Sequence, residues 1–196
     1  MAADVDIANA ALRKLGSPLR LSALDQNDPK ARILNDAYLP TLEAELRRAV
    51  WSFSKTRASI PADAAVSTWG DWNRYPVPND FLYLIRDDES GQDVDWDVEG
   101  GNEAGQGTFI LSATAAPLNI RYVRREKNVA LMDPLFRDAF AYRLAYDNCK
   151  ALGGTNETRD RLRQEYRDAI AEATRVGSLE KQSVTPPEDS WVNARI

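Results

Sequence analysis

One stretch, residues 133–154, constrains the fold of this chain more than any other. Its sequence, DPLFRDAFAYRLAYDNCKALGG, predicts a complete helix. Asp133 can cap the first free N–H groups, Pro134 suits the first helical position, and Gly153 with Gly154 supplies a left-handed exit. Apolar residues follow two adjacent rows at helical spacing, Phe136, Phe140 and Leu144 in one and Leu135, Ala139, Tyr142, Tyr146 and Cys149 in the other. So wide an apolar surface needs more than one neighbouring element to cover it.

A second helix follows directly, with Thr155 or Asn156 as its cap. Its apolar positions share one stripe, made of Leu162, Tyr166, Ala169, Ile170, Ala173 and Val176. The short connection predicts an antiparallel hairpin in which this helix covers one row of the first. The other row then needs helices from the N-terminus or from another subunit. The face formed by Phe136, Phe140, Leu144, Tyr142 and Tyr146 is therefore interpreted as a core or an inter-subunit surface.

The arginines of this second helix alternate with acidic residues. Arg159, Arg161, Arg163 and Arg167 are interleaved with Asp160, Glu165 and Asp168. This pattern is typical of a salt-bridged helix face, which we favour over a phosphate-binding row.

Two further helices are predicted near the N-terminus. Val5, Ala8, Leu12 and Leu15 recur at helical spacing between a capping Asp4 and the stop at Gly16, and Asp28-Pro29 begins a second helix that reaches about Ala49. From Trp51 the apolar period changes to two, and short strands are expected at 51–60, 81–85, 94–98, 108–112 and 118–123. The fold class is therefore α+β, with a four-helix layer, an inserted small antiparallel β domain and an extended C-terminal arm. The helical domain is expected at 1–50 and 129–181, the β domain at 51–128 and the arm at 182–196.

Composition excludes several function classes. The chain has no histidine and a single cysteine, Cys149, which excludes histidine-dependent triads, imidazole and thiolate metal sites and intrachain disulfides. A formal charge of −5 argues against tight binding of nucleic acid. No apolar run approaches the ~18 residues of a membrane span, and no signal peptide is expected. We expect no enzyme activity, no cofactor and no catalytic or metal-binding residue, with Cys149 as a core residue.

Four carboxylates alternate along one predicted strand, Asp93, Asp95, Asp97 and Glu99. They could form a cation site or a glycosidase-like acid pair, which needs two carboxylates held over a cleft. Alternatively, they form a solvated or channel-facing edge while Val94, Trp96 and Val98 pack inward. Strict alternation favours the second interpretation.

The last residues carry apolar side chains on a polar segment that has no helical or strand period. Trp191, Val192 and Ile196 lie close to Arg195 in the closing sequence DSWVNARI. They either anchor a partner or fold back on their own chain. The enrichment of tryptophan at binding hot spots favours a partner.

The order of these segments resembles the tail tubular protein A family, the head-to-tail adaptors of short-tailed bacteriophages. The motifs that carry the resemblance are LRRAVWSFSKTRA (46–58), YPVPNDFLYLI (75–85), VDWDVEGG (94–101), FILS (109–112), LNIRYVRR (118–125), DPLFRDAFAYRLA (133–145) and DSWVNARI (189–196). Together they span nearly the whole chain, and each is weak alone. The sequence departs from the family pattern at 61–74 and 99–107.

The resemblance implies a structural virion protein, assembled in the host cytoplasm and located at the head–tail junction. It implies a homo-oligomeric ring, a dodecamer, docked beneath the portal protein, with helices in the wall and the strands facing the tail nozzle or a neighbour. Double-stranded DNA would pass through without tight binding during ejection. Trp191, Val192, Arg195 and Ile196 would bind the portal, and Asp93, Asp95, Asp97 and Glu99 would face the channel. The alternatives are a soluble non-enzymatic binding module of another assembly and, third, a hydrolase that uses carboxylates.

Overall fold

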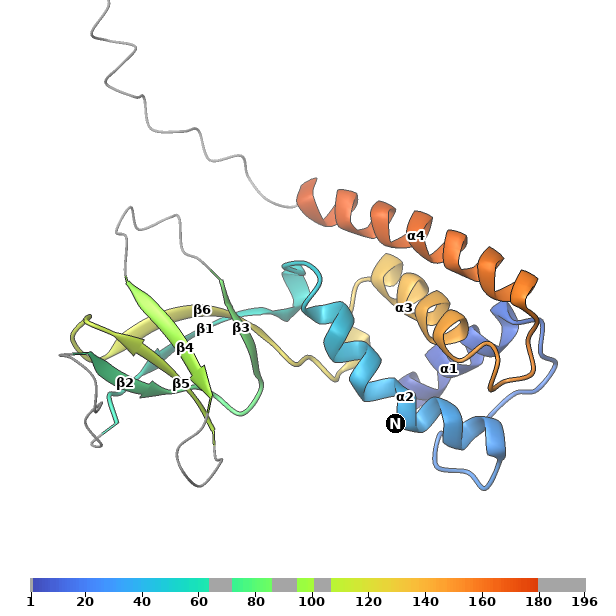
Figure 1. The fold of residues 1–196 in the computed structure, drawn as a ribbon, viewed down its shortest axis with the longest axis horizontal. Coiled ribbons are helices and arrows are strands. Elements are labelled where there is room, and N and C mark those ends of the chain that lie inside the picture. Colours follow the sequence, from blue (N-terminus) through green and yellow to red (C-terminus); the bar gives the residue numbers. More distant parts are fainter. Residues whose placement is uncertain (1, 64–71, 86–94, 101–106, 180–196) are drawn as a thin grey trace, which may run out of the picture.

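The computed structural model describes residues 2–63, 72–85, 95–100 and 107–179 of the chain. The protein is mixed α+β, and its strands come between two pairs of helices in the sequence (Figure 1). The helices are α1 (Ala2–Lys14), α2 (Pro29–Leu46), α3 (Pro134–Asp147) and α4 (Asn156–Leu179), with short 3-10 helices η1 (Ser52–Ser54) and η2 (Val129–Leu131). The strands are β1 (Lys55–Ile60), β2 (Asn73–Pro76), β3 (Phe81–Ile85), β4 (Trp96–Gly100), β5 (Thr108–Ser112) and β6 (Leu118–Arg124).

Helix starts follow the capping chemistry that the sequence predicts. The Asp28 side chain accepts hydrogen bonds from the backbone N–H groups of Lys30 and Ala31, and Asp133 does the same for Leu135 and Phe136. Thr155 caps α4, because its Oγ1 accepts from the Thr158 N–H at 3.1 Å. Asp4 was predicted to be a cap, but α1 begins before it, at Ala2. Asp4 lies in the first turn instead, where a carboxylate suits the helix dipole.

The connection between α3 and α4 is tight and depends on glycine. Gly153 has a φ of +91°, and a Cβ on Gly154 would lie 2.3 Å from the Cys149 sulfur. Helix α3 ends at Asp147, earlier than the sequence predicts, and residues 148–153 form turns. The Asn148 side chain donates to the Leu144 carbonyl at 2.9 Å and so competes with continuation of the helix.

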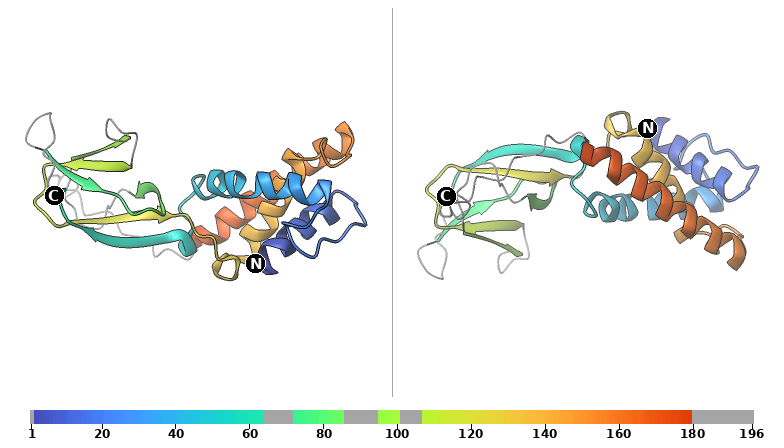
Figure 2. Two further views of the ribbon diagram at one scale, coloured as in Figure 1. Left: turned by 90° about the horizontal axis from the view of Figure 1, so that it is seen from below. Right: turned by 90° about the horizontal axis from the view of Figure 1, so that it is seen from above.

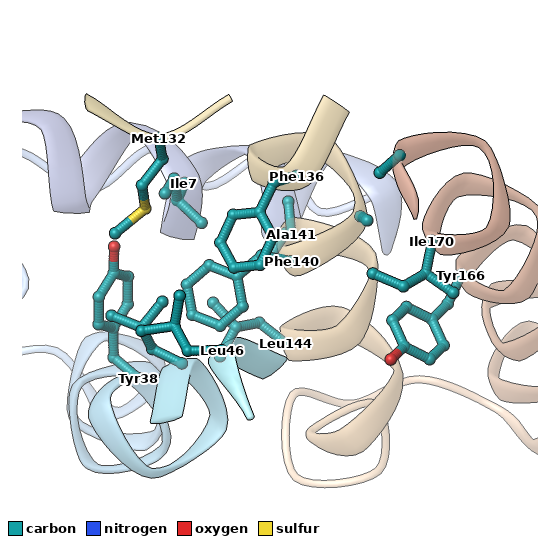
Figure 3. Close-up of a cluster of buried hydrophobic side chains, with 14 of the residues drawn as sticks. Ile7, Tyr38, Leu46, Met132, Phe136, Phe140, Ala141, Leu144, Tyr166 and Ile170 are labelled. Atoms are coloured by element: carbon teal, nitrogen blue, oxygen red, sulfur yellow. The ribbon is translucent and has the colours of Figure 1, made fainter. Parts of the chain in front are cut away.

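Helix α3 lies at the centre of the helical part. It contacts α1, α2 and α4, and its inward face is fully covered by this chain (Figure 3). Side chains of α3 with no exposed surface are Phe136, Ala139, Phe140, Ala141, Leu144 and Ala145. In Figure 3, Tyr38 and Leu46 of α2 lie on one side of α3, and Tyr166 and Ile170 of α4 lie on the other. Of the two possible sources of cover, N-terminal helices and another subunit, the chain uses its own N-terminal helices.

The helices and strands meet through a small apolar and ionic junction, at the middle of an elongated molecule (Figure 2). Trp51 and Phe53 pack on Phe136, with ring centroids 4.8 and 5.0 Å away. The Arg47 guanidinium donates to the Leu82 carbonyl, and Arg125 pairs with Glu43. The prediction that residues 51–54 belong to a strand is wrong. They include the 3-10 helix η1, because Trp51 and Phe53 both turn toward the same ring of α3.

The strands form two antiparallel sheets of three within the described residues, in the orders β1-β6-β3 and β2-β5-β4. The sheets share an apolar core of their own, made of Ile60, Tyr75, Ile110, Leu118, Ile120 and Tyr122. Strand β4 lies at one edge and takes no part in that core. The prediction that Val94, Trp96 and Val98 pack inward is wrong for Trp96 and Val98, since they are 39% and 36% exposed. Val94 lies outside the described residues.

The enclosed position of Phe136 predicts a large effect of truncation. Phe136→Ala should lower the free energy of unfolding by about 3–5 kcal/mol, because it removes a buried ring that contacts three other aromatic rings. Urea unfolding measures this. Leu131→Ala is the control, because Leu131 is 53% exposed, and it should change stability by less than about 0.5 kcal/mol. Equal effects of the two variants would contradict the described core.

Candidate functional site

A buried carboxylate lies where α2, α3 and α4 meet. Glu45 falls three residues after Leu42, on the apolar row of α2, and is 2% exposed. Its Oε1 accepts a hydrogen bond from the Tyr166 hydroxyl at 2.7 Å and lies 3.9 Å from Nη1 of Arg143. Its Oε2 accepts no hydrogen bond from the described residues. The buried Glu45 side chain therefore holds the Tyr166 hydroxyl in a fixed position inside the helical part.

The Tyr166 hydroxyl also contacts Arg48, an arginine at the surface. Arg48 donates from Nη1 to the Tyr166 hydroxyl at 2.9 Å, and its guanidinium carbon lies 5.5 Å from the centre of the ring. Arg143 lies 5.4 Å from the same ring centre and pairs with Asp147 at 2.6 Å. Burial raises the pKa of Tyr166 to about 12, and the hydrogen bond to Glu45 adds to the rise. The tyrosine is neutral at physiological pH and orients Arg48.

A groove opens beside Arg48, between the end of α2 and the C-terminal half of α4. Its volume is about 530 Å³. It is lined by Arg48, Arg167, Ile170, Ala171, Thr174, Arg175 and Ser178. The salt-bridged face predicted for Arg159, Arg161, Arg163 and Arg167 is not found, because none of these arginines makes an ion pair with a residue in the described ranges. Arg175 makes no ion pair there either. The groove thus combines three arginines with an apolar floor, and it can take an anionic group next to an apolar one.

The second exposed feature is β4. Asp95, Asp97 and Glu99 are all exposed and alternate with Trp96 and Val98, so carboxylates and apolar side chains lie on opposite faces of the strand. Hydrogen bonding to β5 occupies one edge of β4. Asp93, the fourth predicted carboxylate, lies outside the described residues. The strand therefore presents an acidic face and an apolar face to its surroundings.

The remaining predicted residues fall into two groups. Phe136, Phe140 and Leu144 are core residues, so the inter-subunit interpretation does not hold for them. Tyr142 and Tyr146 are half-buried: the Lys14 ammonium lies 3.3 Å from the Tyr142 ring centre, and the Arg143 and Arg159 guanidiniums lie 5.8 and 5.4 Å from that of Tyr146. Trp191, Val192, Arg195 and Ile196 lie outside the described residues.

Cys149 is buried, as predicted, and burial raises the pKa of its thiol. The described part of the chain holds no group of three or more acidic or cysteine side chains placed to bind a metal ion. None of its helices has the length and apolar character needed to cross a bilayer.

Sequence reasoning did not identify Glu45, Tyr166 and Arg48 as a connected group. The available signal was a carboxylate at an apolar position of α2, three residues after Leu42. No protein-family model matches the sequence, and no curated protein matches it.

The raised pKa of Tyr166 predicts a loss of stability at high pH. A pKa above the usual value of 10 means that folding favours the neutral phenol. This contribution is complete below pH 10 and is lost as the pH rises through about 12. Tyr166→Phe should therefore reduce the fall in unfolding free energy between pH 9 and 11 by on the order of 1 kcal/mol. Glu45→Gln, which keeps the burial and removes the carboxylate, should give an intermediate reduction.

Urea unfolding at the two pH values measures both effects. An equal fall in unfolding free energy in the wild type and in the Tyr166→Phe variant would show that the Tyr166 hydroxyl is not buried and hydrogen-bonded to Glu45.

Proposed function

We propose that the chain is a structural subunit of a phage virion, the head-to-tail adaptor that forms a ring under the portal and continues the DNA channel. The observation that carries the proposal is β4, which lies at the edge of its sheet among the described residues and exposes one apolar and one acidic face. Exposed Trp96 and Val98 on a sheet edge are typical of a surface that another chain covers. The resemblance of the motif order to tail adaptors supports this choice of assembly.

The two ends of the molecule suit different tasks in such a ring. The helical part, with the four-helix arrangement and the enclosed α3, would form the wall. The strands at the other end of the elongated molecule would reach the tail nozzle or a neighbouring subunit, with Trp96 and Val98 in that contact. The second face of β4 would then place Asp95, Asp97 and Glu99 toward the bore. Carboxylates there would repel DNA phosphates and keep DNA from binding to the channel wall. The C-terminal arm, with Trp191, Val192, Arg195 and Ile196, would bind the portal.

The direct test is electron microscopy of the purified chain mixed with purified portal protein. The expected result is a ring of the chain beneath the portal, with the β4 carboxylates toward the bore. A portal that remains bare would reject the adaptor function and favour the alternative, a non-enzymatic binding module of another assembly. A ring with β4 turned away from the bore would reject only the role of the carboxylates.

Deletion of residues 183–196 gives a sharper prediction. The truncated chain should keep its circular dichroism spectrum and its cooperative unfolding, because all three apolar clusters lie within residues 5–173. It should lose portal binding, because the arm supplies the anchoring tryptophan. Sedimentation with portal measures this binding. Binding at the wild-type level would show that the arm does not anchor the chain to the portal.

A further inference from the structure

The groove between α2 and α4 lies directly beside the point where the chain leaves its last helix. Ser178 lines the groove, and α4 ends at the next residue, Leu179, which is 73% exposed. Seventeen residues follow, 180–196. Whatever position those residues take, they start at one end of the groove.

The groove is prepared for a negatively charged and aromatic segment. Arg48 is held in place through Tyr166 and the buried Glu45, so little side-chain freedom is lost when it binds an anion. Arg167 and Arg175 have no acidic partner among the described residues. Ile170 forms a floor against which an apolar side chain can lie. Three arginines around one groove repel each other until an anion joins them.

The chain itself carries a segment with the matching chemistry. Glu188 and Asp189 are adjacent carboxylates, and Trp191 follows two residues later. We propose that this segment, residues 188–192, docks into the groove of its own chain, with Glu188 and Asp189 on the arginines and Trp191 on the apolar floor. The inference concerns the free chain and does not depend on what the chain assembles with.

The lengths allow this contact within one molecule. The groove runs along α4 from Arg167 to Ser178, eleven residues that span about 17 Å at 1.5 Å per residue. The eight residues 180–187 can reach about 26 Å when extended, which is enough to return along that distance. Because the segment is tethered, its effective concentration is in the millimolar range, and a weak contact suffices to hold it. A partner that binds Trp191 more tightly would draw the segment out of the groove.

The test follows Trp191 in the full chain. The emission of the wild type minus that of Trp191→Phe isolates this side chain from the other four tryptophans. Docking predicts blue-shifted emission and acrylamide quenching at least two-fold weaker than for a free tryptophan peptide. In Arg167→Glu/Arg175→Glu, emission should shift to the red and quenching should rise to the level of the peptide. Arg159→Glu/Arg163→Glu is the matched control, because it makes the same charge change on the same helix outside the groove, and it should leave Trp191 unchanged.

Charge reversal of the docking segment itself separates loss of docking from misfolding of the helices. Glu188→Lys/Asp189→Lys lies beyond α4 and should release Trp191 to the same extent. A variant that combines both pairs of substitutions should again protect Trp191 from acrylamide, because the ion pairs between segment and groove form with their charges exchanged. The proposal would be overturned if acrylamide quenched Trp191 of the wild type as strongly as the free peptide. It would also be overturned if the combined variant did not regain protection of Trp191 from acrylamide. Protection at 100 µM that disappears at 1 µM would place the segment in the groove of a second copy and overturn docking within one chain.

Discussion

The ring of Phe136 lies between Trp51, Phe53 and Phe140, and Phe140 in turn meets the edge of Tyr38 at 5.2 Å. Through these contacts α3 holds α2 on one side and the start of the strands on the other. Because Phe136 and Phe140 are fully buried, the position of each neighbouring element is fixed by packing against α3. The location of the groove and the direction of the β part both follow from that packing.

Charge is distributed unevenly over the molecule, and this distribution supports the proposed roles. Carboxylates lie on β4, and the groove beside the C-terminal half of α4 is lined by Arg48, Arg167 and Arg175, which form no ion pair with the described residues. The buried Glu45 belongs to the second region, since it orients Tyr166 and thereby Arg48. A subunit with two surfaces of opposite charge can contact different partners through them, as the proposed adaptor between a portal and a nozzle would.

The sequence predicted best those features that depend on neighbouring residues. The caps at Asp28, Asp133 and Thr155 and the left-handed Gly153 need only local chemistry, and the structure confirms them. Features set by distant contacts were missed. The alternation at Trp51–Ser54 resembled a strand because both aromatic side chains pack on Phe136, and Trp96 was expected inside because alternation shows two faces without showing which is covered. The pairing of Glu45 with Tyr166 joins residues 121 positions apart, which no local pattern could reveal.

Hydrogen exchange of the α3 amides at two protein concentrations tests most directly the claim that this chain encloses α3 without help from another copy. Amides of residues 136–147 should exchange only through global unfolding, with the same protection at 1 µM and at 100 µM. Weak protection at 1 µM that rises with concentration would show that a second subunit completes the core, and would contradict the fold described here.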